Sequence, residues 1–175
     1  EEFKKMENGK WKMEKTKIYG LPEKFVLYVG DVTWNKNLPR LVQAVQSLEI
    51  PLVMVGKALV QENFDKNNPW NKNLVEFHAL RKGDKNITRL GFLPTEDVVA
   101  LYNLATVFAM PSIYEGFGLP LVEAMQCGCP IVTTDESSIP EVVDKAAYYI
   151  NGYDYKSISH GISAVYNDEN LQHKL

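Results

Sequence analysis

The chain has 175 residues, of which 45% are hydrophobic and 23% are charged, and its formal net charge is −3. This is the composition of an ordinary globular domain, and it supplies no basic field that would collect nucleic acid. No run approaches the roughly 18 apolar residues of a membrane span. Cys127 and Cys129 are too close in sequence for an unstrained disulfide. We therefore expect buried, reduced thiols in a cytoplasmic protein.

Residues 1–20 are polar and rich in lysine, with scattered apolar side chains that form no clean helical stripe. We interpret this segment as a solvated inter-domain connector, with a partly helical structure as the alternative. From residue 21 the pattern changes, and residues 21–175 are expected to form one folded domain.

Short apolar runs alternate with segments of helical periodicity along this domain. The apolar runs predict strands at 25–30, 51–56, 87–92, 107–112, 130–135 and 146–150. The periodic segments predict helices at 38–48, 74–80, 95–105, 119–127 and 158–166, and a short helix near 140. Thr95 is the expected N-cap of its helix, and Gly128 is the expected C-terminal cap of another.

Strands that are nearly all apolar are buried on both faces, which is typical of a parallel sheet covered by helices. The sequence therefore predicts an α/β fold, a doubly wound Rossmann-like parallel sheet of about six strands with helices on both faces. Ligands of such sheets bind at the carboxyl ends of the strands, where the strand order reverses. With the common order 3-2-1-4-5-6, the loops after the first and fourth strands flank that point.

Lys36 follows the first strand and is a point charge that could reach a phosphate. Gly116 and Gly118 follow the fourth strand and precede a helix, whose free first-turn amides form an anion site. Glu115 and Glu123 could accept hydrogen bonds from vicinal hydroxyls. Taken singly, these residues have ordinary explanations: a solvated lysine, glycines that satisfy a turn, and a glutamate that complements the helix dipole.

Residues 114–125 together (Tyr-Glu-Gly-Phe-Gly-Leu-Pro-Leu-Val-Glu-Ala-Met) resemble the signature of the retaining GT-B glycosyltransferases of group 1, which include glycogen synthases and bacterial mannosyltransferases. Further matches lie at residues 28–30, 35–37, 55–56, 90–92, 111–112, 128–132 and 140–143. The resemblance spans residues 17–170 and corresponds to the C-terminal, donor-binding half of such an enzyme.

The resemblance implies a role for each matching residue. Lys36 would contact the donor diphosphate and Glu115 the donor sugar, which makes them the expected catalytic residues, while Glu123 would hold the ribose. The expected donor-binding set is Gly30, Lys36, Gly56, Gly91, Phe92, Leu93, Ser112, Glu115, Gly116, Phe117, Gly118, Leu119 and Glu123. One residue departs from the family pattern: Asp31 stands where many members carry an arginine that contacts the diphosphate, and Lys57 is a candidate replacement.

The implied activity is that of a retaining hexosyltransferase whose donor is a GDP- or UDP-linked sugar, with neither a metal nor a cofactor. The N-terminal acceptor domain is not represented in the match, so we expect the isolated domain to bind donor without transferring sugar. Membrane association would come only through that other half. Two alternatives stay open, a degenerate nucleotide-sugar-binding module and a GT-B epimerase. A response-regulator domain is disfavoured because no acidic cluster follows the first strand.

Overall fold

The computed structural model describes residues 3–6 and 10–175. Its six strands form one sheet in the order β3-β2-β1-β4-β5-β6, and all five strand pairs are parallel. The strands are β1 (Val26–Val29), β2 (Leu52–Val55), β3 (Ile87–Arg89), β4 (Val107–Met110), β5 (Ile131–Thr134) and β6 (Tyr148–Ile150). The order reverses between β1 and β4, so the predicted doubly wound, Rossmann-like fold is confirmed.

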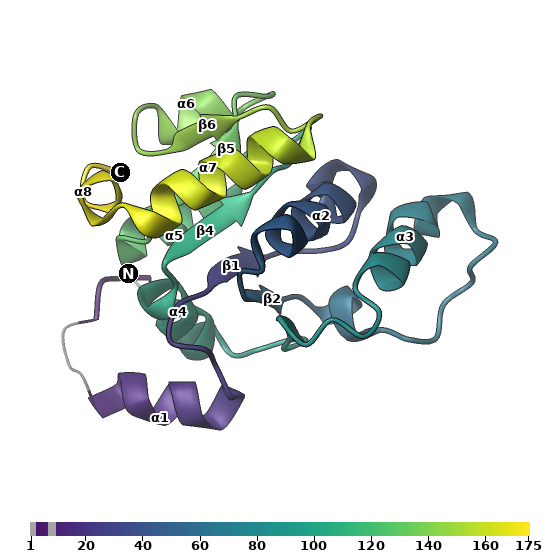
Figure 1. Ribbon diagram of the computed structural model, residues 1–175, viewed down its shortest axis with the longest axis horizontal. Coiled ribbons are helices and arrows are strands. Elements are labelled where there is room, and N and C mark those ends of the chain that lie inside the picture. The colour runs from purple at the N-terminus through teal and green to yellow at the C-terminus, as the bar shows by residue number, and fades with distance from the viewer. Residues whose placement is uncertain (1–2, 7–9) are drawn as a thin grey trace.

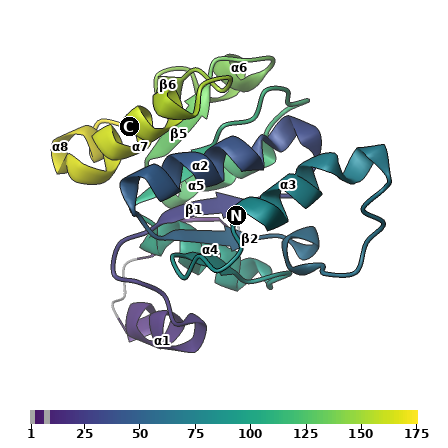
Figure 2. The same ribbon diagram turned by 45° about the vertical axis from the view of Figure 1, so that its right-hand side comes forward.

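Helices cover both faces of the sheet (Figures 1 and 2). One face carries α2 (Leu38–Leu48), α3 (Lys72–Leu80) and α7 (Tyr155–Asn167), and the other carries α4 (Thr95–Leu104), α5 (Leu119–Cys127) and α6 (Ile139–Val143). The remaining elements are α1 (Lys10–Tyr19), α8 (Glu169–Gln172) and the short 3-10 turns η1 (Trp34–Lys36), η2 (Lys57–Val60) and η3 (Pro69–Asn71).

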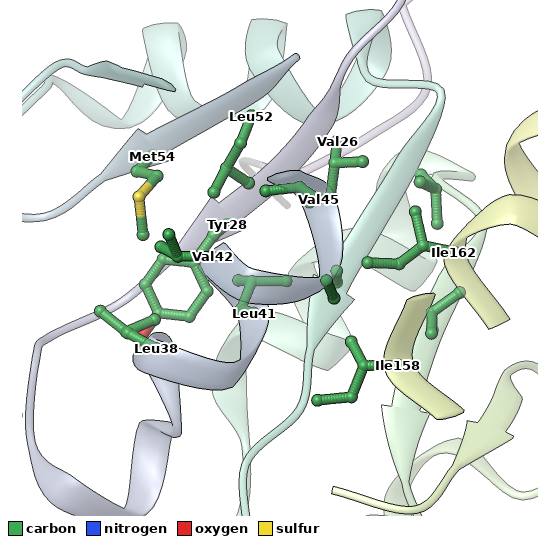
Figure 3. Close-up of a cluster of buried hydrophobic side chains, with 14 of the residues drawn as sticks. Val26, Tyr28, Leu38, Leu41, Val42, Val45, Leu52, Met54, Ile158 and Ile162 are labelled. Carbon is green, nitrogen blue, oxygen red and sulfur yellow. The ribbon is translucent and has the colours of Figure 1, made fainter. Parts of the chain in front are cut away.

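The core is double because strand side chains alternate between the two faces. Val26 and Tyr28 of β1 pack beneath α2, whereas Leu27 of the same strand belongs to the cluster on the other face. Figure 3 shows the first cluster, in which side chains of α2 and α7 meet those of β1 and β2. Cys127 and Cys129 lie in the second cluster as buried free thiols, as expected.

Most predicted helices begin and end close to their expected residues, but the N-cap of α4 was predicted wrongly. Pro94 takes the cap position, and Thr95 is the first helical residue. The Pro94 carbonyl accepts the first amide bonds, from Asp97 and Val98. Gly128 does cap α5, in the left-handed conformation with φ 67°.

The N-terminal segment is more ordered than the sequence suggested, because α1 packs against α4. Lys15 and Tyr19 of α1 both donate hydrogen bonds to Asp97, which is buried; the Tyr19 bond measures 2.6 Å. Burial alone would raise the pKa of Asp97, but these two hydrogen bonds outweigh it and hold that pKa below its ordinary value. Residues 10–19 therefore form a helix that packs against α4 on one side, while Glu14, Lys17 and Ile18 are exposed; residues 1, 2 and 7–9 lie outside the described part.

Within the described residues, no helix combines the length and the apolar character needed to cross a membrane.

Candidate functional site

A cavity of about 510 Å³ lies at the carboxyl ends of β1 and β2, beside the point where the strand order reverses. The loops after β1, β2 and β3 form most of its wall, and α4, α5 and the N-terminal segment close it. Its lining residues are Phe3, Val29, Gly30, Asp31, Val55, Gly56, Lys57, Ala58, Gln61, Gly91, Phe92, Leu93, Thr95, Val98 and Glu123.

The floor of this cavity is backbone packed against backbone. The Gly30 amide donates to the Val55 carbonyl and the Gly56 amide donates to the Gly91 carbonyl, each at 2.9 Å, so the ladder of the sheet continues into the loops. A Cβ atom on Gly56 would lie 2.0 Å from the carbonyl oxygen of Gly30. Only glycine fits this position, which leaves a shallow, rigid surface against which a flat ligand can lie.

Glu123 is one of two carboxylates that line the cavity, with Asp31, and it comes from the second turn of α5. The Tyr102 hydroxyl donates a hydrogen bond to its Oε2 atom at 3.0 Å. Burial raises the pKa of Glu123, and the hydrogen bond from Tyr102 opposes that rise. The site therefore holds a half-buried acceptor that is suited to ligand hydroxyl groups.

The loops after β1 and β4 meet beside the cavity. Lys36 Nζ donates to Glu115 Oε1 at 2.6 Å, and only 16% and 8% of the two side chains are exposed. The Glu115 carbonyl accepts hydrogen bonds from the hydroxyls of Ser137 and Ser138 at 2.7 and 2.9 Å. A lysine and a glutamate that are 79 residues apart in sequence are thus held together where the sheet changes direction.

The turn before α5 presents backbone donors. Gly118 precedes the first residue of α5 with φ +85°, a conformation that favours glycine. The amides of Gly116, Phe117 and Gly118 meet no hydrogen-bond acceptor within the described part of the chain. Free amides at the positive end of a helix dipole are suited to binding an anion.

Some of the donor-binding residues predicted from sequence line the cavity, and the others lie in the segments beside it. The cavity is lined by Gly30, Gly56, Gly91, Phe92, Leu93 and Glu123. Seven others are not among its lining residues: Lys36 ends η1, Leu119 begins α5, and the loop between β4 and α5 carries Ser112, Glu115, Gly116, Phe117 and Gly118. Of these, Phe117 and Leu119 are exposed, whereas Ser112 is fully buried and its hydroxyl finds no partner among the described residues.

Three residues that shape the site had no role assigned from sequence. Phe3 and Tyr102 contact each other beside Glu123. Asn37 adopts the left-handed conformation, with φ 58°, and is buried. Its side-chain amide donates to the carbonyls of Pro111 and Gly152, which fixes the loops after β4 and β6. The available signal for Asn37 was its residue type, because asparagine is enriched at positive φ.

Two solved structures share this fold at low sequence identity. The *Anabaena* protein Alr3699/HepE, solved in complex with UDP and glucose, superposes with a TM-score of 0.81 over 99% of this chain and 46% of its own, at 20% identity. The C-terminal domain of a group 1 glycosyl transferase family protein (LpcC) from *Francisella tularensis* gives a TM-score of 0.73 over 98% of this chain and 89% of its own, at 22% identity.

Curated relatives are closer in sequence. O-antigen chain mannosyltransferase B of *Escherichia coli* is 38% identical over 77% of this chain and 35% of its own length. Serotype-specific mannosyltransferase WbdA of *Escherichia coli* is 31% identical over 90% of this chain and 19% of its own length. The chain thus spans about a third or less of these relatives. The family model described as glycosyl transferases group 1 matches residues 11–175, so the chain belongs to the group 1 glycosyl transferases.

Proposed function

We propose that this chain is the donor-binding domain of a retaining hexosyltransferase and that it binds a nucleoside-diphosphate sugar where the cavity meets the 115–119 loop. The observation that carries the proposal is that three features lie next to one another where the strand order reverses. The first is a cavity with a glycine floor and Glu123 in its wall, the second is Lys36, and the third is the set of three free amides before α5.

Each part of the donor then has a matching group. The nucleoside occupies the cavity, with its ribose hydroxyls on Glu123. The diphosphate lies on the free amides of residues 116–118, and Lys36 supplies the positive charge. Lys36 must exchange its bond to Glu115 for a phosphate oxygen, which frees the Glu115 carboxylate to accept hydrogen bonds from the sugar.

The chemical contribution of this half is electrostatic. The free amides stabilise the negative charge that develops on the departing diphosphate without rearrangement, and Lys36 adds its positive charge once it has exchanged Glu115 for a phosphate oxygen. We propose that this is sufficient without a metal. We also propose that transfer retains the anomeric configuration, with a phosphate oxygen of the donor taking the acceptor proton, as the family resemblance implies.

The acceptor is expected to bind an N-terminal domain of the full-length protein, so this chain alone should not transfer sugar. The partial coverage of longer relatives supports that arrangement. Because both of those relatives are named mannosyltransferases, GDP-mannose is the favoured donor, with UDP-linked sugars next. The buried, unpaired thiols of Cys127 and Cys129 support a cytoplasmic location.

The test is calorimetric titration of the chain with GDP, UDP, ADP and their common sugar conjugates, with magnesium and again with EDTA. We expect one base to be preferred, and we expect the affinity to be the same with and without the metal. The corresponding nucleosides serve as controls, because they lack the phosphates that Lys36 and the free amides would bind. If neither the chain nor the full-length protein bound any nucleoside diphosphate at millimolar concentration, the proposal would be wrong.

A transfer assay on the full-length protein tests the catalytic part of the proposal. The anomeric configuration of the product, followed by proton NMR, should match that of the donor. Tight donor binding without any transfer would instead favour a degenerate binding module, and a change in the donor sugar itself would favour an epimerase.

A further inference from the structure

Tyr102 is a buried residue of α4 whose hydroxyl group reaches the wall of the cavity. Its side chain is only 1% exposed. The hydroxyl lies 3.0 Å from Glu123 Oε2 and 3.2 Å from the carbonyl oxygen of Pro120. A phenol carries one proton, and a bond to a carboxylate is stronger than one to a neutral carbonyl, so the carboxylate is the preferred acceptor.

Aromatic rings hold the Tyr102 ring in place. Phe108 of β4 makes an edge-to-face contact with it, with 5.3 Å between the ring centroids. Phe3 makes a second edge-to-face contact, at 6.2 Å. Burial and the nearby Glu123 carboxylate raise the pKa of Tyr102 well above its ordinary value, so the hydroxyl remains a donor throughout the neutral range.

Glu123 needs such a partner if it is to be ready for a ligand. A glutamate side chain has several rotatable bonds, and fixing it at the moment of binding costs affinity. The Tyr102 hydroxyl binds Oε2, while Oε1 has no hydrogen-bond partner in the described part of the chain. One oxygen is therefore held by the protein, and the other stays available to ligand hydroxyls.

We infer that Tyr102 is a positioning residue that holds the Glu123 carboxylate in the orientation that accepts hydrogen bonds from the ribose hydroxyls of the donor nucleotide. This inference rests on the proposed function and adds to it a residue that does not itself touch the ligand. It assigns to α4 a part in selecting ribonucleotides over deoxyribonucleotides.

The test compares GDP with 2′-deoxy-GDP, and UDP with 2′-deoxy-UDP, by calorimetry on the wild-type chain and on Tyr102→Phe. The phenylalanine keeps the ring contacts and removes only the hydroxyl. We expect the ribonucleotide to lose about 3- to 10-fold in affinity, which is the cost of immobilising one free side chain. The deoxy analogue should lose less than about twofold, so that the ribose preference shrinks.

A double-mutant cycle shows whether Tyr102 acts through Glu123. Glu123→Gln should also reduce the ribose preference, and adding Tyr102→Phe to it should change affinity by less than about twofold. Tyr149→Phe is the matched control, because the Tyr149 hydroxyl also binds a carbonyl, that of Asp144 at 2.6 Å, and Tyr149 does not line the cavity. It should leave both affinities unchanged.

The possible failures can be told apart. If the wild-type chain binds neither GDP nor UDP, the proposed function fails and this inference fails with it. If Glu123→Gln removes the ribose preference but Tyr102→Phe keeps it, the positioning role alone is wrong. If Tyr102→Phe does not fold, Glu123→Asp is a second test, because it keeps the charge and moves the carboxylate; an unchanged ribose preference in that variant would show that the position of the carboxylate does not matter and would overturn the inference.

Discussion

The two ends of the candidate site are built differently. At the proposed nucleoside end, the loops after β1, β2 and β3 are tied together by backbone hydrogen bonds around an open cavity of about 510 Å³. At the proposed phosphate end, Lys36 and Glu115 are bonded to each other at 2.6 Å and are mostly buried. Under the proposed function, the first end can receive a ligand as it stands, whereas the second must exchange an internal ion pair for one with the ligand. Affinity at the first end should therefore depend on shape, and affinity at the second on charge.

The largest effect is expected from a change in shape at the nucleoside end. Gly56→Ala places a Cβ atom against the Gly30 carbonyl, and two backbone segments must separate to accept it. We expect nucleotide binding to be lost and stability to fall by about 1–3 kcal/mol or more. Thermal denaturation and calorimetry measure the two effects.

Gly116→Ala is the control for Gly56→Ala, because nothing lies within 4 Å of a Cβ atom at Gly116 and its φ is not positive. It should leave the melting temperature unchanged. Normal binding and stability in Gly56→Ala would show that the cavity floor can adapt. The proposed difference between a cavity end that depends on shape and a Lys36–Glu115 end that depends on charge would then be wrong.

A smaller effect, confined to phosphate-bearing ligands, is expected from Lys36→Ala. Losing a charged partner of the diphosphate should cost roughly 1.5–3 kcal/mol, which weakens GDP binding about tenfold or more, while guanosine binding stays the same. Titration with both ligands measures this difference. Equal losses for guanosine and GDP would argue against a phosphate contact.

The Lys36 variant also leaves Glu115 buried without its partner, which costs stability. Adding Glu115→Gln should recover the melting temperature without recovering GDP affinity. This double variant therefore separates the structural role of the ion pair from its proposed role in binding.

The smallest effect is expected at Asp31, which lines the cavity where many family members carry arginine. Asp31→Arg should raise GDP affinity about two- to fivefold, which is the range for a solvent-screened charge contact. Guanosine affinity should stay the same, and Asp31→Asn shows how much of the gain comes from removing the negative charge alone. A fall in GDP affinity in the arginine variant would place the diphosphate elsewhere.

The sequence was sufficient for the fold because its signals were local. Each central strand is a short, continuous apolar run, such as 51–56, and the helices between them show clear periodicity. The loops of the site could also be located, because the carboxyl ends of parallel strands share one edge of the sheet. The turn at 116–118, which we propose binds the diphosphate, could be located from its glycines and from the helix after it.

What the sequence could not predict depends on contacts between distant residues. The α1 helix lacks an apolar stripe and is held by Lys15 and Tyr19, which bind Asp97 about 80 residues away. The bond between Tyr102 and Glu123 joins two helices, and neither residue type alone indicates it. The pairing of Lys36 with Glu115 was likewise not predicted, although both were identified as candidate site residues.

The side chain of Asn37 has a consequence for how this domain folds. Two of its hydrogen bonds reach across 74 and 115 residues of chain, to Pro111 and Gly152. Contacts over such separations form late, because long loops must close first. The loop that carries Lys36 is tied to the loop after β4 by Asn35, Lys36 and Asn37, and it gains its tie to the loop after β6 only when Gly152 is in place. In a growing chain, the contacts of Asn37 should therefore be complete only after residues 111 and 152 have both been made.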